Sequence, residues 1–174
     1  MKLAGVVRRI DELGRIVVPK EIRKTLRIKS GENLEIFVSD NNIILRKYSQ
    51  IDKLNDIAQA ISQTLNLSLK ANILIANNDK YIIASGSQKR DYIDKEISSE
   101  ILKIIENRKS IILKDQTLKL IEDKEEKANY IISPIIVQGD IIGTIVVFSQ
   151  DNLTEETLNT IKIISNILAK YIEQ

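Results

Sequence analysis

The sequence of 174 residues contains no cysteine and no histidine. Without cysteine the chain cannot form a disulfide, a thiolate zinc site or an iron–sulfur cluster, and it has no thiol nucleophile. Without histidine it lacks the commonest transition-metal ligand and the commonest general base. Carboxylates alone can bind Mg²⁺ or act in catalysis, but their spacing here favours neither. We therefore expect no metal, no cofactor and no enzymatic activity.

Long apolar runs are also missing. The segment LAGVV before Arg8 is too short for the hydrophobic region of a signal peptide. No segment approaches the roughly 18 uninterrupted apolar residues that a membrane helix needs. With 43% apolar and 29% charged residues, the composition is that of an ordinary globular protein. We expect a soluble, cytoplasmic protein that does not bind membranes.

The net charge of +2 conceals an uneven distribution. Residues 1–50 hold 11 Lys and Arg against 6 Asp and Glu, whereas residues 51–174 hold 15 against 18. Six of the basic residues lie between Val6 and Leu26. Such asymmetry is typical of a chain in which one part faces nucleic acid. On charge alone, the alternative is a basic surface that is simply solvated.

The first fifty residues predict a small unit of short elements. These are strands over residues 4–10 and 15–18, a helix over 19–26 that begins at Pro19, and a hairpin over 34–48. So small a unit buries little surface, and it has no metal or disulfide to stabilise it. Because oligomerisation is the remaining route, we expect an obligate dimer in which strands from both chains share one core.

The rest of the chain predicts an antiparallel sheet with helices. The expected elements are a helix over 49–69, strands over 71–77 and 80–86, a helix over 94–108, a short strand over 110–114, a charged mobile loop over 117–129, a strand pair over 130–149 and a helix over 153–174. The last helix is apolar around more than half of its circumference, so it must be buried on two sides. One side fits its own sheet, and the other a partner subunit.

The helix that joins the two parts carries a regular apolar stripe. Ile51, Leu54, Ala58, Ile61 and Leu65 follow spacings of three and four, the pattern of a coiled-coil seam. The same stripe would also serve a helix that covers a sheet. We divide the chain into a domain over residues 1–50, a linker or first helix of the second domain over 51–70, and a domain over 71–174.

The order of motifs in the first domain is distinctive. The sequence reads GVVRRIDELGRIVVP, then a short basic helix, then a hairpin that ends in LRKY. It closely resembles the AbrB family of swapped-hairpin DNA-binding domains. The resemblance implies that two chains interleave their hairpins into one small β-barrel with a basic face for double-stranded DNA.

The second domain is similar to GAF domains. The resemblance rests on PI before a strand, on a turn followed by IIGTIVVF, and on the closing helix. The implied fold class is α+β, in which an interleaved swapped-hairpin β-barrel is joined by a helix to a GAF-like antiparallel sheet flanked by helices. Together the two parts resemble transcription regulators of spore-forming Firmicutes.

The AbrB pattern also implies which residues bind DNA. The family's contacting positions fall on Arg8, Arg15, Arg23 and Lys24, and the adjacent Arg9 can either reach DNA or be solvated. These charges would displace condensed counterions from phosphates. Lys24 stands where relatives often carry arginine, and an ammonium does not make a bidentate contact. The sequence has no recognition helix of the usual length, so we expect readout of DNA shape more than a dense set of base contacts.

Acidic residues interrupt this basic stretch at Asp11, Glu12 and Glu21. We expect them to pair with nearby arginines and to hold them in position. Catalytic carboxylates would need a pocket, and this region is too small to form one.

Two roles for the GAF-like domain remain open at this point. Its helices can join two dimers into a homotetramer, or it can bind an unidentified small ligand and change the spacing of the DNA-binding domains. Ser85, Ser87 and Asn129 are polar residues that could line a pocket or could equally lie in turns and edges. For the whole chain we expect a nucleoid-associated regulator of sporulation-stage genes. The alternative is an antitoxin-like or other partner-binding regulator with the same swapped hairpin.

Overall fold

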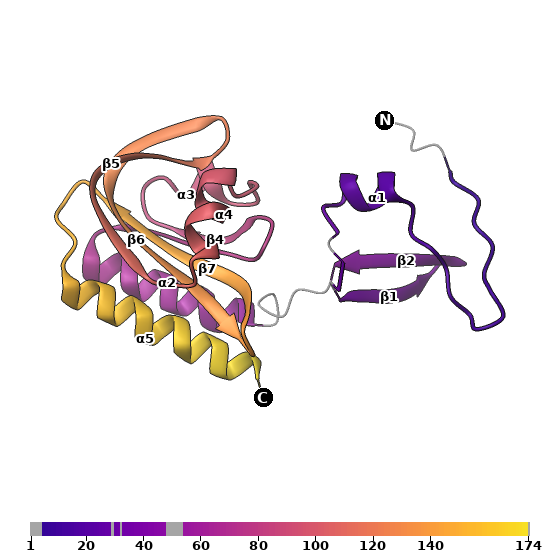
Figure 1. The fold of residues 1–174 in the computed structure, drawn as a ribbon. Coiled ribbons are helices and arrows are strands. Elements are labelled where there is room, and N and C mark those ends of the chain that lie inside the picture. Colours follow the sequence, from indigo (N-terminus) through magenta and orange to yellow (C-terminus); the bar gives the residue numbers. More distant parts are fainter. Residues whose placement is uncertain (1–4, 29, 32, 48–53, 174) are drawn as a thin grey trace. The chain divides into compact units, whose positions relative to one another are not determined.

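The computed structural model describes residues 5–28, 30–31, 33–47 and 54–173. The chain divides into two compact units, Met1–Tyr48 and Ser49–Gln174 (Figure 1). The first unit holds one helix and one hairpin, and the second holds a five-stranded sheet with helices. In the part of the chain that is described, no helix is both long and apolar enough to cross a membrane.

The first unit contains a β-hairpin and a short helix. Strand β1 (Leu34–Ser39) pairs in antiparallel register with β2 (Asn42–Lys47), and α1 (Lys20–Thr25) precedes them. Asp40 and Asn41 have positive φ angles of 48° and 65°, as a two-residue hairpin turn with the twist of the strands requires. The hairpin predicted from the sequence is therefore present, and its turn is the polar Asp-Asn pair.

The segment before α1 differs from the prediction. Strands were expected over residues 4–10 and 15–18, but residues 5–18 contain none, so that expectation is wrong for this part of the chain. The two arms meet at their turn, where the Asp11 amide donates to the Arg15 carbonyl at 3.1 Å. A strand needs hydrogen-bonded neighbours along its length. The hairpin of the same chain pairs only β1 with β2 and offers these arms no ladder.

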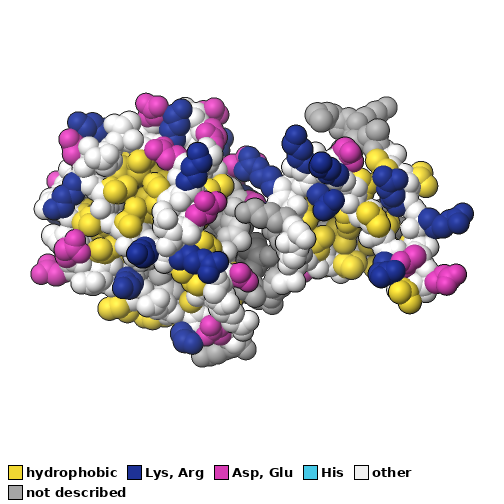
Figure 2. All heavy atoms as spheres, in the orientation of Figure 1, with side chains coloured by type: hydrophobic (Ala, Val, Ile, Leu, Met, Phe, Trp, Pro, Cys, Tyr) yellow, Lys and Arg dark blue, Asp and Glu magenta, His cyan; other side chains and the backbone are white. Residues whose placement is uncertain are grey.

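Apolar side chains of the first unit lie on its surface. Val7, Val38 and Leu13 are 92%, 81% and 75% exposed. Among the described residues of this unit, Pro19 alone is buried. Figure 2 shows hydrophobic side chains on the surface of this unit beside its Lys and Arg side chains. A monomeric protein rarely leaves so much apolar surface in water. Taken alone, the described part of this unit has no core.

The second unit is built on an antiparallel sheet with strand order β4–β3–β7–β6–β5. Its strands are β3 (Asn72–Ala76), β4 (Tyr81–Ser85), β5 (Ile111–Ile121), β6 (Lys124–Val137) and β7 (Asp140–Ser149). Its helices are α2 (Asn55–Leu69), α3 (Lys89–Tyr92), α4 (Ser99–Glu106) and α5 (Glu155–Ile172). Ser98 and Thr154 cap the first turns of α4 and α5 with their side-chain oxygens, which satisfies amides that have no partner within the helix.

The two faces of this sheet carry different cores. Helices α2 and α5 cover one face, where Ala58, Leu65, Ile161 and Leu168 pack against aliphatic strand residues (Figure 1). Helices α3 and α4 lie on the other face. The large aromatic side chains of the core lie on this second face: Tyr81, Tyr92, Tyr130 and Phe148. The sheet is therefore covered on both sides, as its strongly apolar strands require.

Helix α2 uses its apolar stripe to cover the sheet. Leu54, Ala58 and Leu65 are at most 7% exposed and belong to the aliphatic core, and Ile61 packs against that core half-buried. Ile51, the first residue of the predicted seam, lies outside the described residues. The stripe could form a coiled-coil seam or cover a sheet, and its described residues cover the sheet.

The charged segment 117–129 is not a loop. It lies within β5 and β6 and their tight connection, so the predicted mobile loop is wrong. Leu118 and Leu120 are buried, whereas Lys119 between them points away and pairs with Glu125 across the hairpin at 3.7 Å. A strand buries alternate side chains only. Lys119, Glu125 and Lys127 lie on the outer face, whereas Lys124 and Glu126 lie half-buried on the inner face. Charge on both faces conceals the alternation in the sequence.

Candidate nucleic-acid interface

The five basic residues expected to bind DNA are all exposed. Arg8 and Arg9 lie on the extended arm, Arg15 closes the loop that follows it, and Arg23 and Lys24 lie in the last turn of α1. With the exception of Arg15, these residues form no ion pair with any residue that the structure describes. Their charges are thus available to a polyanion.

The loop between the two arms is organised by one carboxylate. Asp11 Oδ1 accepts the amides of Leu13 at 3.0 Å and Arg15 at 2.8 Å, and Oδ2 accepts Nε of Arg15 at 2.7 Å. The Gly14 amide donates to the Asp11 carbonyl at 2.9 Å, and its φ of 75° suits glycine. The Arg15 amide, followed by the Arg15 side chain, lowers the pKa of Asp11. A pairing of this acid with a nearby arginine was expected from the sequence.

Helix α1 carries two basic side chains in its last turn. Glu21 lies in its first turn and Arg23 and Lys24 in its last, an arrangement that complements the helix dipole. The Arg23 amide donates to the Pro19 carbonyl at 2.9 Å, so the helix begins directly after the proline. Lys47 of β2 donates from Nζ to the Arg27 carbonyl at 3.2 Å and ties the end of this region to the hairpin.

The hairpin presents two different faces. On one, Arg46 Nη2 pairs with Glu35 Oε2 at 2.7 Å, and the Arg46 guanidinium lies 4.8 Å from the ring centroid of Phe37. Phe37 therefore already stacks on a cation of its own chain. The opposite face is apolar, with Val38 and its cross-strand partner Ile43 more than two-thirds exposed. The described residues of the first unit leave that face open.

In the second unit the aromatic face of the sheet is closed by its own side chains. Ring centroids are 5.6 Å apart for Tyr92 and Phe148, and 6.1 Å apart for Tyr81 and Tyr92 and for Tyr130 and Phe148. All four residues are at most 1% exposed. Burial raises the pKa of Tyr81, Tyr92 and Tyr130 above the ordinary value. Tyr81 donates to the Leu120 carbonyl at 2.9 Å.

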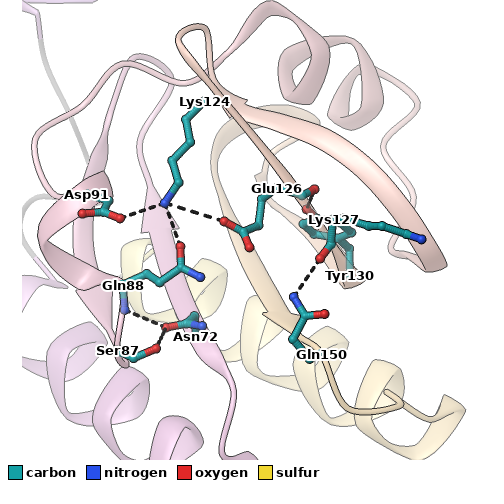
Figure 3. Close-up of polar contacts among 9 residues, drawn as sticks. All are labelled: Asn72, Ser87, Gln88, Asp91, Lys124, Glu126, Lys127, Tyr130 and Gln150. Carbon is teal, nitrogen blue, oxygen red and sulfur yellow. Dashed lines mark hydrogen bonds and ion pairs between the residues drawn. The ribbon is translucent and has the colours of Figure 1, made fainter.

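A lysine joins the β5–β6 hairpin to helix α3 over this cluster (Figure 3). Lys124 Nζ lies 2.7 Å from Asp91 Oδ2 and 2.8 Å from Gln88 Oε1, and 4.9 Å from the ring centroid of Tyr92. Glu126 is 3.6 Å away on the other side. Burial acts to lower the pKa of Lys124, but the hydrogen bond to Asp91 and further attractions raise it above the ordinary value.

Beside α3 the second unit has an open polar groove. Its volume is about 320 Å³. It is lined by Gln59, Gln63 and Asn66 of α2 and by the segment from Ala84 to Lys89. Asn72 supports its rim, because Asn72 Oδ1 accepts the Gln88 amide at 3.1 Å (Figure 3). The lining is rich in amides and poor in apolar groups.

The three polar residues considered for a pocket have different surroundings. Ser85 and Ser87 line the groove, and Ser85 also accepts a hydrogen bond from the Ser62 hydroxyl at 2.8 Å. Asn129 is not among the groove residues. Its Oδ1 accepts the amide of Asp115, and its Nδ2 donates to the Gln150 carbonyl, so it secures a bulge in β5.

Comparison with known proteins gives the family of the chain. Residues 53–173 match the family model described as stage V sporulation protein T C-terminal, transcription factor. Over 178 aligned residues, which cover all of both chains, the sequence is 43% identical to stage V sporulation protein T of Bacillus subtilis. The chain belongs to the stage V sporulation protein T family.

Both units of this family member have further relatives. Over 48 residues, 28% of the chain and half of the relative, the sequence is 56% identical to the transition state regulatory protein AbrB of Bacillus subtilis. Residues 7–53 match the family model for antidote-toxin recognition MazE, a bacterial antitoxin. The AbrB-type first domain that the sequence indicated is thereby confirmed.

The second unit has the GAF fold. It is similar to a methyl-accepting chemotaxis protein domain, with a TM-score of 0.56 and 19% identity over 71% of this chain and 93% of that one. The GAF domain of A. aeolicus nlh2 gives a TM-score of 0.53 and 18% identity over 71% and 93%. At such identities the likeness concerns fold alone.

For the second unit of this family member, the sequence did not indicate the pair of Lys124 and Asp91, and it indicated Asn129 without its partner Asp115. Lys124 is 33 positions from Asp91, and Asn129 is 14 from Asp115. Contacts of that separation leave no local pattern. By contrast, the loop that Asp11 closes onto Arg15 has a local signal, because Asp followed three residues later by Gly is typical of a turn.

Proposed function

We propose that this protein is a DNA-binding regulator of sporulation-stage transcription. Its first unit binds duplex DNA as an interleaved homodimer through Arg8, Arg9, Arg15, Arg23 and Lys24. Its GAF-like unit joins two such dimers into a homotetramer. The observation that carries the proposal is a unit that combines exposed cations with an apolar surface it does not cover, in a chain of a transcription-factor family.

The dimer follows from the missing core of the first unit. Ile36, Val38, Ile43 and Leu45 lie on one face of the hairpin, and all are exposed. The arm over residues 5–10 has strand-forming side chains, and it pairs with no strand among the described residues. A second copy would supply both an apolar cover and a hydrogen-bonded partner. That arrangement supports residues 1–50 as the DNA-binding domain.

DNA binding follows from the charges that remain unpaired. Arg8, Arg23 and Lys24 form no ion pair with the described residues, so no internal contact must be broken when phosphates bind. If a dimer makes about eight phosphate contacts, log K should fall against log salt with a slope of about −7. Helix α1 has six residues, too few for a recognition helix that lies along the major groove. We therefore favour recognition of DNA shape.

Tetramer formation is supported by the outer face of α5. Ile163, Ile167 and Tyr171 are spaced four apart, and they are 59%, 45% and 51% exposed. These residues form a stripe opposite the buried side of the helix, which includes Ile161 and Leu168. Such a stripe fits a second helix of the same kind. Two DNA-binding dimers joined in this way would bind with higher effective affinity than one.

Ligand sensing is a second candidate role for the GAF-like unit. The observation that favours it is the groove of about 320 Å³ lined by amides and hydroxyls of Gln59, Gln63, Asn66 and Ser87. These groups match an uncharged organic molecule with hydrogen-bonding atoms. The aromatic face does not offer an equivalent space, because Tyr92 and its neighbours fill it.

The test of DNA binding is fluorescence anisotropy of a labelled A/T-rich duplex with the full chain at several salt concentrations. Arg23→Ala should weaken binding to all sequences and reduce the salt slope by about one for each lost phosphate contact. Lys109→Ala removes the same charge from an exposed position of the second unit and should change neither quantity. Absence of salt-sensitive binding by the unaltered chain would overturn the proposal.

A further inference from the structure

The carboxylate of Asp11 does two separate things. Its Oδ1 accepts two backbone amides, of Leu13 and of Arg15, and so closes the loop. Its Oδ2 accepts Nε of Arg15 at 2.7 Å. The first role concerns the backbone and can be filled by any acceptor of that shape. The second concerns the arginine side chain alone.

The contact at Nε leaves the outer end of Arg15 unoccupied. A guanidinium carries five N–H donors, of which Nε supplies one and the two terminal nitrogens supply four. Those terminal nitrogens donate no hydrogen bond to the residues that the structure describes, and the side chain is 72% exposed. The end that remains is the pair of nitrogens that contacts a phosphate or the O6 and N7 atoms of guanine in bidentate fashion.

We propose that Asp11 is a positioning residue for DNA binding. It holds Arg15 by Nε so that the two terminal nitrogens of the guanidinium face the DNA. This contact should increase the affinity for DNA, because a long side chain is ordered before binding and loses less rotamer freedom in the complex. The proposal rests on the DNA-binding function proposed above and deepens it at one residue.

The sign of the effect distinguishes positioning from mere proximity. Asp11 is a negative charge within a surface that attracts phosphates. If it only lay nearby, its removal would reduce repulsion and tighten DNA binding. If it positions Arg15, its removal weakens DNA binding although the protein becomes more positive. The two readings predict changes in opposite directions.

Asp11→Asn separates the two roles of the carboxylate. The amide oxygen can still accept the amides of Leu13 and Arg15, but the amide nitrogen is a donor and cannot accept Nε of Arg15. Glu12→Gln is the matched control, because it removes the same charge at the next residue. The Glu12 side chain is exposed and forms no ion pair with the described residues. Both variants keep the length of the side chain.

The experiment is anisotropy with the full chain and a labelled A/T-rich duplex at fixed salt. We expect Asp11→Asn to weaken binding about three- to tenfold, the range for one side chain that must be ordered on binding. Glu12→Gln should bind as tightly as the unaltered protein or more tightly. In an Arg15→Ala background, Asp11→Asn should no longer weaken binding. Unchanged melting temperatures would show that the loop and the dimer are intact.

Three outcomes would overturn the proposal. The first is that Asp11→Asn binds as tightly as Glu12→Gln, which would mean that Asp11 only lies near the DNA. The second is that Asp11→Asn weakens binding by the same factor when residue 15 is alanine, which would mean a general effect on the loop. Equal affinity of Arg15→Ala and the unaltered protein would also overturn it, since there would be no contact to position. If the unaltered chain does not bind DNA at all, the proposed function fails first, and that result is distinct from these three.

Discussion

Lys124 Nζ lies 2.7 Å from Asp91 Oδ2, and this contact joins the tip of the β5–β6 hairpin to helix α3 (Figure 3). Helix α3 has four residues, and it is also held by the buried ring of Tyr92 and by the Gln88 amide, which donates to Asn72 Oδ1. The same ammonium lies over the ring of Tyr92, which α3 contributes to the aromatic core. Lys124 thus holds α3 over that core.

Replacing Lys124 by Met should loosen α3. The stem of the side chain is kept, while the hydrogen bonds to Asp91 and Gln88 are lost. We expect the free energy of unfolding of the second unit to fall by about 1–2 kcal/mol. Hydrogen exchange of the amides around α3 should become faster. Lys127→Met is the control, since its pair with Asp115 is exposed and such pairs contribute about 0–1 kcal/mol. Equal effects of the two variants would contradict this role.

The buried tyrosines predict a loss of stability in alkali. Burial raises the pKa of Tyr81 and Tyr130 in the folded protein, whereas an unfolded tyrosine ionises near pH 10. Above about pH 10 the unfolded chain therefore binds fewer protons than the folded one, and stability falls as the pH rises. Thermal melting followed at several alkaline pH values should show this decline, together with an increase in tyrosinate absorbance at the unfolding transition. Tyrosinate absorbance from these residues in the folded protein would contradict it.

The sequence predicted those elements whose signals are local. The hairpin with its turn at Asp40 and Asn41 and the apolar stripe of α2 are both present. The strands expected in the arm before α1 are absent because strand formation needs a partner ladder, and the described residues offer this arm none. That prediction failed because strand pairing is not a property of one segment.

A second failure has a different physical cause. The segment 117–129 looked like a loop because charged residues outnumber apolar ones there, although Leu118 and Leu120 are buried on one face. Composition conceals a period of two when charged side chains lie on both faces of a hairpin, as Lys119 and Lys124 do here. The proposed DNA surface was predictable in part. The motif indicates which basic residues bind DNA, whereas only the structure gives the contact between Asp11 and Arg15.

The apolar face of the hairpin predicts which substitutions separate the proposed dimer. Val38→Lys places a charge on the face that a second chain would cover, so the first unit should lose its structure and its DNA binding. Ser39→Lys adds the same charge to the next residue, whose side chain points to the other face. Hydrogen exchange of amides 34–47 in the full chain measures the difference. Protection should be lost in Val38→Lys and kept in Ser39→Lys, and protection in both would contradict the proposed dimer.

The stripe on α5 predicts the assembly of the whole protein. Ile167 is 45% exposed between Ile163 and Tyr171, and it is the central member of the surface through which two dimers are proposed to join. A lysine at position 167 would have to lose its hydration when the apolar stripes pack together, and this cost would prevent association.

We therefore expect Ile167→Lys to convert the tetramer into dimers, measured by light scattering on the eluted protein. Asn166→Lys adds the same charge to an exposed neighbour that faces about 100° away around the helix, and it should leave the mass unchanged. The dimers of Ile167→Lys should still bind DNA, but more weakly than the tetramer on a duplex long enough for two sites. If Ile167→Lys keeps the mass of the unaltered protein, α5 does not join the dimers, and its exposed stripe must serve another contact.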